Sequence, residues 1–450
     1  MNFIHPLRKI TGVISIGAKM SKRKLHLSAS AIGAFLACPM RFKGAYIDGV
    51  RKSVQTESQR RGTNWHELLE IVGLPLEAVC RFCAHMMHPD ADCPVCQGTG
   101  YLVGDSMDAA HRMLASSYEH VPAGVAVEDW QTERAKLFYS LSAYKWWWGI
   151  GEQEQDYKVI ATEVPFDMPI INPGTGNPCR DVVLVGKIDK VVQFSDGSFG
   201  QMEHKSTARP IGDDCEYWKH LRMDVQTTLY PYAMLRMQKE GKLEHLDIMP
   251  DSPIATKVLY DAWHTPAIKM KKLSFADTKK FVRECEYMGE KFGITGASIE
   301  TTFKTLTSGK QSKVSKDTVL YGKDVRVDGH PVKTIKGAKE GDVNFMETEG
   351  MYGTRLFTDI TGNPERFYNR REINRSVDEM AIFERKMYSI YKAVLMMRRT
   401  DGWWTDGTQC EVKFRCQYTP YCWHGEELSP DNLLEGFECI FRKDDENGDA

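Results

Sequence analysis

The stretch that decides the fold is "VGKIDKVVQFSDGSFGQMEHKST", residues 185–207, whose pattern is typical of two strands joined by a tight turn. One turn that fits is a three-residue loop, Ser195-Asp196-Gly197, in which glycine takes the left-handed position that this hairpin requires. Counting outward from that loop pairs Phe194 with Ser198. The same count fixes which side chains face each other farther along the two strands.

With this register Asp189 lies directly opposite Glu203, and Lys205 lies two residues farther along the same face. Facing carboxylates repel and destabilise a sheet, whereas a divalent cation such as Mg²⁺ between them reverses the effect because it takes carboxylate oxygens as ligands. A two-residue Asp196-Gly197 turn is the alternative, and it sends Asp189 to the opposite face. Turn chemistry alone leaves both registers open.

The composition of the whole chain limits which classes of protein it can belong to. A chain of 450 residues with 42% hydrophobic and 27% charged residues is long enough for more than one compact unit. It contains no run of 18 apolar residues, so no membrane span is expected. The formal net charge of −2 means that any nucleic-acid binding must come from local basic patches. The basic residues 1–24 contain no acid and are expected to form a disordered leader.

Twelve cysteines in 450 residues are too few for a disulfide scaffold, and their clustering indicates metal binding in a reducing compartment. The first cluster has the spacing C-x2-C-x9-C-x2-C, which supplies the four thiolates of a closed structural zinc site: Cys80, Cys83, Cys93 and Cys96. His85 or His88 could replace one of them.

A second cluster lies near the C-terminus and consists of Cys410, Cys416 and Cys422. Three thiolates are one ligand short of a four-coordinate site or a cubane cluster. The remaining cysteines are isolated, apart from Cys38, which precedes a proline.

The rest of the chain has the pattern of mixed helix and strand. A helix over 25–45 is capped by Ser28 or Ser30 and interrupted at Cys38-Pro39, and a second helix over 60–72, capped by Thr63, carries His66 and Glu70 on one face. The further segments are a cysteine-rich insert (77–104), a helical stretch (105–156), strands from 157, a helix (224–241), an insertion (266–350), a long helix (366–398) and a tail (426–450).

The part of the insertion from 304 to 339 holds nine Lys and Arg residues against three Asp. It has many Gly and Ser residues and little periodicity, which predicts a surface loop or mobile flap. Lys310, Lys313 and Lys316 are its candidate phosphate contacts.

Five motifs taken in order resemble those of the RecB-like PD-(D/E)XK nucleases: "LSASAIGAFLACPMRF", "RRGTNWHELLE", "LVGKIDKV", "MEHKST" and "QTTLY". The late cysteines resemble the iron–sulfur branch, which includes the AddB nuclease domain and CRISPR-associated RecB-like exonucleases. The resemblance covers about residues 25–72, 157–235 and 366–425. It implies an α/β, restriction-endonuclease-like core over 157–265, with a central mixed sheet flanked by helices. The zinc-binding insert is extra to that core.

The resemblance also implies a role for each matching residue. His66, Asp189, Glu203 and the backbone carbonyl of His204 would bind catalytic Mg²⁺ or Mn²⁺, Lys205 would orient the attacking water, and Gln226 and Tyr230 would support the site and DNA. Cys38 would join Cys410, Cys416 and Cys422 around a [4Fe–4S] cluster. The chain departs from the pattern where both gaps between its late cysteines are five residues and where Pro231 follows Tyr230.

The sequence therefore predicts a metal-dependent DNA nuclease. The expected activity is that of an exonuclease that prefers single strands and acts in replication, recombination or repair, with a helicase or recombinase as a candidate partner. The alternative is a non-catalytic DNA-binding or assembly module that retains the nuclease fold.

Overall fold

A computed structural model of the chain describes residues 24–441 except 76, 85, 87, 150–155, 306, 338–341 and 413–414, and it leaves undescribed the side chains of 304, 305 and 312–314. The predicted leader therefore lies outside the described residues, apart from Lys24. No helix in the described ranges is both long enough and apolar enough to cross a bilayer.

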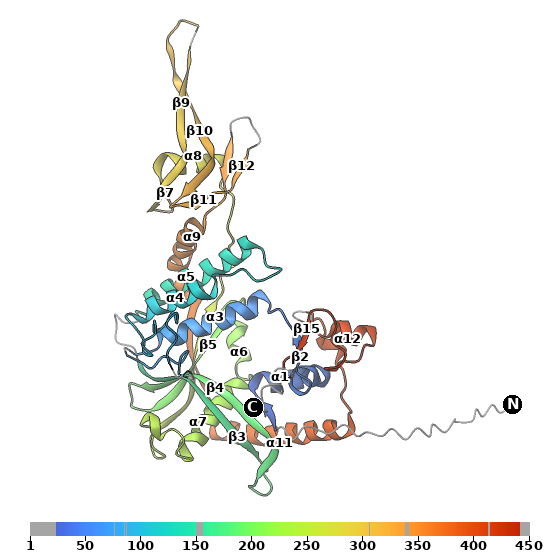
Figure 1. Cartoon of the computed structure of the whole chain (residues 1–450). Coiled ribbons are helices and arrows are strands. Elements are labelled where there is room, and N and C mark those ends of the chain that lie inside the picture. Colours follow the sequence, from blue (N-terminus) through green and yellow to red (C-terminus); the bar gives the residue numbers. More distant parts are fainter. Residues whose placement is uncertain are drawn as a thin grey trace, which may run out of the picture.

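The core is a six-stranded mixed sheet (Figure 1). β4 pairs antiparallel with β3 and β5 and parallel with β1, β5 continues parallel to β6, and β14 closes the far edge antiparallel to β6. The strands are β1 (Leu25–Leu27), β3 (Tyr157–Ile171), β4 (Pro178–Phe194), β5 (Phe199–Thr207), β6 (Ile254–His264) and β14 (Tyr368–Asn374). This is the α/β fold with a central mixed sheet that the sequence predicts.

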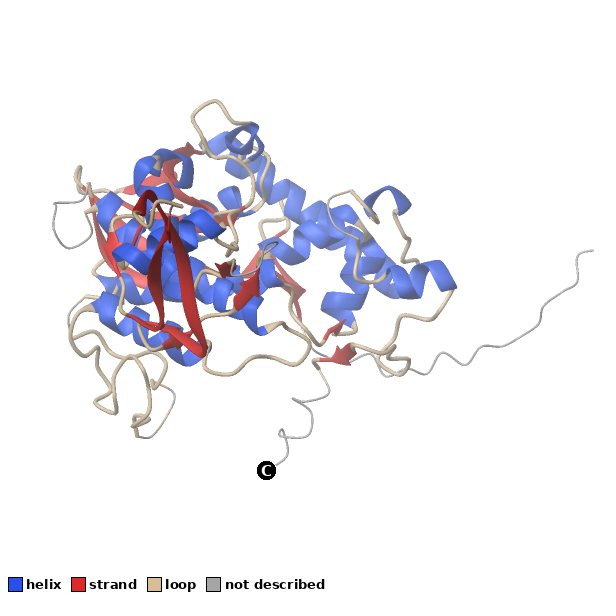
Figure 2. Cartoon of the chain, turned by 90° about the horizontal axis from the view of Figure 1, so that it is seen from above, coloured by secondary structure: helices blue, strands red, loops and turns tan. Residues whose placement is uncertain are grey.

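Helices cover both faces of the sheet (Figure 2). On one face pack α1 (Ala29–Ala37), α2 (Pro39–Phe42), α7 (Gln226–Lys239) and α11 (Val377–Thr400). The other face carries α3 (Glu57–Val72), α4 (Ser106–Ser117), α5 (Val127–Trp148) and α9 (Glu349–Gly362). Each layer has its own buried cluster, because the alternating side chains of a strand point to opposite faces.

A third unit projects from the helical layer (Figure 1) and has a separate hydrophobic core that includes Phe281, Val319 and Phe345. Its main feature is the long antiparallel hairpin of β9 (Ile294–Thr305) and β10 (Gln311–Val327), which we call the arm. The other elements of the unit are α8 (Phe275–Glu284), β7 (Glu286–Tyr287), β8 (Glu290–Lys291), β11 (His330–Pro331), β12 (Thr334–Lys336) and β13 (Val343–Phe345). The expected surface loop is therefore largely a strand pair.

The N- and C-terminal parts of the chain meet beside the sheet. Strand β15 (Phe437–Cys439) pairs with β2 (Val50–Lys52) in a separate two-stranded sheet, so part of the expected tail is a strand. The Tyr418 hydroxyl donates to the Val50 carbonyl over 2.6 Å. The remaining short elements are η1 (Lys43–Ile47), α6 (Glu216–His220), η2 (Glu244–Leu246), α10 (Pro364–Phe367), η3 (Gly407–Gln409) and α12 (Thr419–His424).

The β4–β5 hairpin adopts the register of the three-residue loop. Lys190 pairs with Met202, and the Phe194 N–H donates to the Ser198 carbonyl over 2.8 Å. Gly197 has a φ of 82°, the left-handed conformation that this turn requires. When this pairing is continued by one residue beyond Lys190 and Met202, Asp189 lies opposite Glu203.

Three helix boundaries differ from the sequence prediction. The predicted helix 25–45 is wrong over 25–27, which form strand β1 beside β4, and α1 starts only after its N-cap Ser28. Helix α3 begins at Glu57 and not after Thr63, because Thr56 and Gln59 form a capping box that satisfies the free N–H groups of an earlier first turn. The predicted helix 366–398 is wrong over 368–374, which form strand β14 along β6. Helix α11 starts only after Ser376, which is its N-cap, so Ile373 belongs to the sheet.

Candidate active site

The structure brings together the six side chains proposed for the catalytic site. They come from four elements that meet beside the β4–β5 hairpin: His66 on α3, Asp189 on β4, Glu203 and Lys205 on β5, and Gln226 and Tyr230 on α7. Helices α3 and α7 lie on opposite faces of the sheet, so the site is built where both layers reach the same strand ends.

Asp189 is held as a carboxylate by its neighbours. Its Oδ2 lies 3.3 Å from Nδ1 of His66 and accepts the backbone N–H of His204 over 2.8 Å. Burial opposes ionisation, but the hydrogen bond and charge of His66, with the charge of Lys205, hold the pKa of Asp189 well below its usual range. Asp189 is therefore an anion that is ready to bind a cation.

Glu203 is buried and has two different oxygens. Its Oε1 accepts from Nε2 of Gln226 over 2.6 Å and from Nζ of Lys205, while Oε2 has no hydrogen-bond partner among the described residues. Burial raises the pKa of Glu203 to about 8, with the Lys205 charge acting against that rise and the Asp189 charge adding to it. A buried carboxylate oxygen without a donor is costly unless something else binds it.

These observations fit a hard divalent cation. The donors are the carboxylates of Asp189 and Glu203, and oxygen ligands are what Mg²⁺ prefers. A cation between them would give Oε2 of Glu203 the binding partner that it lacks, and it would cancel the repulsion between the two facing carboxylates. The ligand roles of His66 and of the His204 carbonyl remain predictions.

A cavity of about 410 Å³ opens beside Asp189. Its lining includes His66 and Tyr230 and also six residues that the sequence did not single out for this site, namely Thr63, Glu67, Glu70, Arg81, Glu163 and Lys187. Burial raises the pKa of Glu70 to about 7, with the Arg81 charge acting against it. Helical spacing from His66 places Glu70 on the cavity side, but the contributions of Arg81 and Glu163 depend on contacts distant in sequence.

The His204 side chain points away from this site, into a buried network on the other face of β5. Its Nδ1 lies 2.8 Å from Oδ2 of Asp261, which also accepts the Tyr144 hydroxyl over 2.5 Å. Nε of Arg370 donates to the other carboxylate oxygen over 3.0 Å. This network anchors β5, β6, β14 and α5 directly behind the candidate metal ligands.

The four cysteines of the first cluster form one compact group. Sγ of Cys80 lies 3.7 Å from that of Cys93, and Sγ of Cys83 lies 3.6 Å from that of Cys96. Four thiolates around one tetrahedral Zn²⁺ have sulfur separations of about 3.8 Å, given Zn–S bonds of about 2.3 Å. All four are buried and could hold a metal ion. His88 is outside the group, and His85 lies outside the described residues.

The second cysteine set is more open. Cys38 ends α1 and accepts the Asp406 N–H at 3.5 Å, and the Cys416 N–H donates to the Cys410 carbonyl over 2.8 Å. Burial raises the pKa of Cys422, and the charges of Cys38, Cys416 and Cys410 raise it further. Among described residues they do not form a single-ion site, but a cubane spreads its thiolates over four irons.

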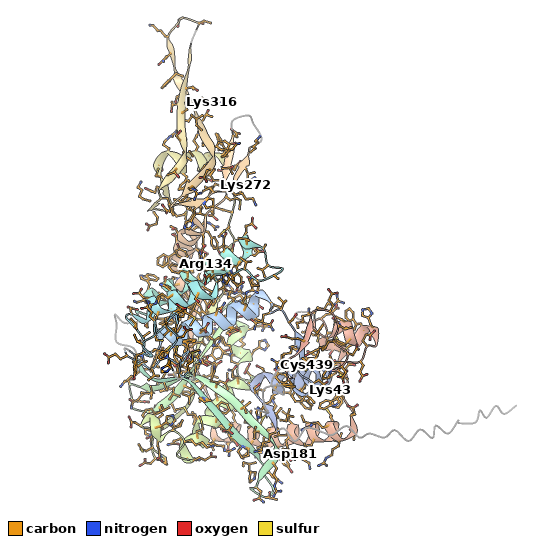
Figure 3. The ribbon with its side chains drawn as sticks, in the orientation of Figure 1. Lys43, Arg134, Asp181, Lys272, Lys316 and Cys439 are labelled. Atoms are coloured by element: carbon orange, nitrogen blue, oxygen red, sulfur yellow. The ribbon has the colours of Figure 1, made fainter. Side chains whose placement is uncertain are left out.

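The candidate phosphate contacts lie far from the cavity. Lys310 and Lys316 are exposed on the arm, as Figure 3 shows for Lys316, whereas the side chain of Lys313 lies outside the described residues. Because these lysines lie far from the β4–β5 hairpin, they are candidates for binding nucleic acid and not for a role in phosphodiester hydrolysis.

Comparison with known proteins agrees with this geometry. No curated protein significantly matches the chain. The PD-(D/E)XK nuclease superfamily matches over residues 26–422, a span that contains the sheet, the hairpin carboxylates and both cysteine sets. The match covers most of the chain, and the chain therefore belongs to the PD-(D/E)XK nuclease superfamily.

Proposed function

We propose that this nuclease is a metal-dependent deoxyribonuclease that hydrolyses phosphodiester bonds, and that it is an exonuclease preferring single strands. The observation that carries the proposal is the buried Glu203 carboxylate, whose Oε2 lacks a donor in the described structure and which faces Asp189 across the hairpin. Two carboxylates in that arrangement destabilise the sheet when no cation is bound, and they form a pair of oxygen ligands when a divalent cation is bound.

The residues of the site divide the work. A bound Mg²⁺ or Mn²⁺ supplies Lewis-acid stabilisation of the phosphate oxygens and a water of lowered pKa. Asp189 and Glu203 hold the cation, and His66 keeps Asp189 oriented and ionised. Lys205 places a fixed positive charge beside the attacking water. Gln226 fixes the rotamer of Glu203 through its 2.6 Å hydrogen bond.

Digestion of labelled DNA tests the proposal. Purified protein is incubated with single-stranded and duplex DNA, labelled at the 5′ or 3′ end, in linear and circular form, with Mn²⁺ or with chelator. We expect metal-dependent release of short products from linear single strands and none from circles. Binding without cleavage under every condition would favour a non-catalytic DNA-binding module, and activity only after addition of a helicase or recombinase would show a partner requirement.

We further propose that Cys80, Cys83, Cys93 and Cys96 bind one structural zinc. We also propose that Cys38, Cys410, Cys416 and Cys422 bind a [4Fe–4S] cluster, which would close a very long loop and join α1 to the C-terminal part.

Metal analysis tests both cysteine proposals. Anaerobically purified protein should be brown, Cys38→Ala should bleach it, and Cys285→Ala, a cysteine in neither set, should not. The Cys80→Ser/Cys93→Ser variant should lose zinc and keep its colour. Colourless wild-type protein with two zinc ions per chain would make the second set a zinc site.

A further inference from the structure

Arg81 lies inside the first zinc knuckle, between Cys80 and Cys83, yet its side chain lines the same cavity as Asp189. Its guanidinium contacts Oε2 of Glu70, on the cavity side of α3. Because the two cysteines that flank it belong to one closed four-thiol group, metal binding there fixes the backbone from which this arginine reaches the cavity. The cysteine-rich insert is thus connected to the candidate active site by one side chain.

A second cation lies beside the arginine. Nζ of Lys187, on β4, contacts Oε2 of Glu163, and Nη1 of Arg81 lies 3.9 Å from the same oxygen. Glu163 has a φ of 55°, a left-handed conformation that is unusual for a residue with a side chain. This carboxylate thereby holds a guanidinium and an ammonium side by side.

The two cations of this cluster are far more exposed than the two carboxylates that they contact. The side chains of Glu70 and Glu163 are only 2% and 10% exposed, whereas those of Arg81 and Lys187 are 38% and 50% exposed. A guanidinium has five N–H donors and an ammonium three, more than these two carboxylates use. Both carboxylates line the cavity as well, but the two cations are the more exposed members of the cluster and keep N–H donors free for a ligand.

We propose that Arg81 and Lys187 form a phosphate-binding subsite for the nucleic-acid strand, next to the metal-binding carboxylates. The inference rests on the proposed nuclease function and deepens it. The ligand is the phosphodiester group that neighbours the one being cleaved, because a guanidinium fork matches two phosphate oxygens and the ammonium acts as a point charge beside it. The zinc insert is then a part of the substrate-binding surface that positions Arg81.

Binding measurements separate this role from a purely structural ion pair. Variants are made in a Glu203→Gln background with Mg²⁺ present, so that the probe, a fluorescein-labelled single-stranded oligonucleotide, stays intact. The variants are Arg81→Ala, Arg81→Lys, Lys187→Ala and the control Arg134→Ala. Arg134 has the same 38% exposure and pairs with Glu349, but it lies on α5 outside the cavity lining (Figure 3). Zinc content and melting temperature are recorded for each variant.

We expect Arg81→Ala and Lys187→Ala each to weaken binding about tenfold, the size expected when a hydrogen bond to a charged group is removed. Each should also flatten the plot of log Kd against log salt by about 0.7, one single-strand phosphate contact. Arg81→Lys should recover the slope but only part of the affinity. In the otherwise wild-type protein, both alanine variants should raise KM more than they lower kcat.

Equal Kd and salt slope for Lys187→Ala, Arg81→Ala and Arg134→Ala would overturn the subsite while wild-type cleavage still supports the nuclease. If Arg81→Ala loses zinc or unfolds, Lys187→Ala, a change on β4 outside the cysteine-rich insert, decides the question. A wild-type protein that neither binds nor cleaves DNA would instead contradict the proposed function itself.

Discussion

Several of the charged side chains buried in this molecule lie on or beside the strand pair of β4 and β5. On one face of β5 lie Glu203 and Lys205, and on the other His204 meets Asp261. Lys190, on the neighbouring strand β4, is buried as well, and burial lowers its pKa to about 8, although the Asp261 charge acts against this. Each such group must be compensated by a partner or a ligand, which is why buried charge is informative about function.

Lys190 gives a pH-dependent prediction. The folded state disfavours the charged form of Lys190, so burying this lysine lowers the free energy of unfolding by its full amount below pH 8. This loss of stability disappears as pH rises toward the unfolded pKa of about 10.4. Lys190→Met should therefore unfold less readily than wild type at pH 7, by at most about 3 kcal/mol, and the difference should shrink by pH 10. Urea unfolding at both pH values measures it, with the exposed Lys158→Met on β3 as control. A gap that widens with pH would contradict the predicted sign.

At the scale of the elements, strands β6 and β14 are connected by ion pairs between their side chains as well as by their backbone hydrogen bonds. Asp261 on β6 meets Arg370 on β14 in the interior, and Lys257 meets Glu372 over 2.5 Å on the same strand pair at the surface. A buried pair loses far more than an exposed pair when one partner is removed, because the remaining charge is left in a medium that cannot solvate it.

Asp261→Asn should accordingly lower the free energy of unfolding by about 3–5 kcal/mol, since it leaves Arg370 charged and buried. Glu372→Gln, the matched surface change, should cost at most about 1 kcal/mol. Chemical denaturation of both variants gives the comparison. Equal effects would mean that the Asp261 network does not secure β14 to the sheet.

The same strands show what sequence can and cannot predict here. The hairpin, its carboxylates and the four-cysteine knuckles are local patterns in which neighbouring residues determine the geometry. The segment that forms β14 is predicted as helix because its helical spacing is genuine, and only pairing with β6, about a hundred residues earlier, decides otherwise. Arg81 reaches the cavity, and Arg370 reaches the Asp261 network behind β5, through similarly distant contacts, which no single-sequence pattern encodes.

At the scale of the whole molecule, the chain is a nuclease core with two additions. The cysteine-rich insert packs against α3 and reaches the cavity, while the arm projects away from the sheet (Figure 1). A two-stranded ribbon is narrow enough to follow a groove of nucleic acid, and Lys310 and Lys316 are exposed near its tip. The additions would therefore contact substrate at two places, close to the cleavage site and far from it.

For the arm, Lys310→Gln/Lys316→Gln should weaken binding of single-stranded DNA at every sequence and reduce the salt slope by about 0.7 for each phosphate that the variant no longer binds. Lys386→Gln, an exposed lysine on α11, is the control. Fluorescence anisotropy over a salt series measures both quantities. A salt slope equal to that of wild type would contradict the prediction that Lys310 and Lys316 bind phosphate.

The central claim is that Asp189 and Glu203 share a catalytic cation, and Glu203→Gln tests it most directly. The amide keeps the shape and the Gln226 contact but loses the charge, so cleavage should disappear while DNA binding stays close to wild type. In chelator two changes oppose each other in the variant, the relief of carboxylate repulsion, worth about 0.2–1 kcal/mol, and the loss of the ion pair with Lys205, so the response to metal decides the claim. Added Mg²⁺ should stabilise wild type by about 2.7 kcal/mol at roughly 100 times its Kd, and should not stabilise the variant. Metal-dependent cleavage retained by Glu203→Gln, or stabilisation of the variant by Mg²⁺ equal to that of wild type, would contradict the claim.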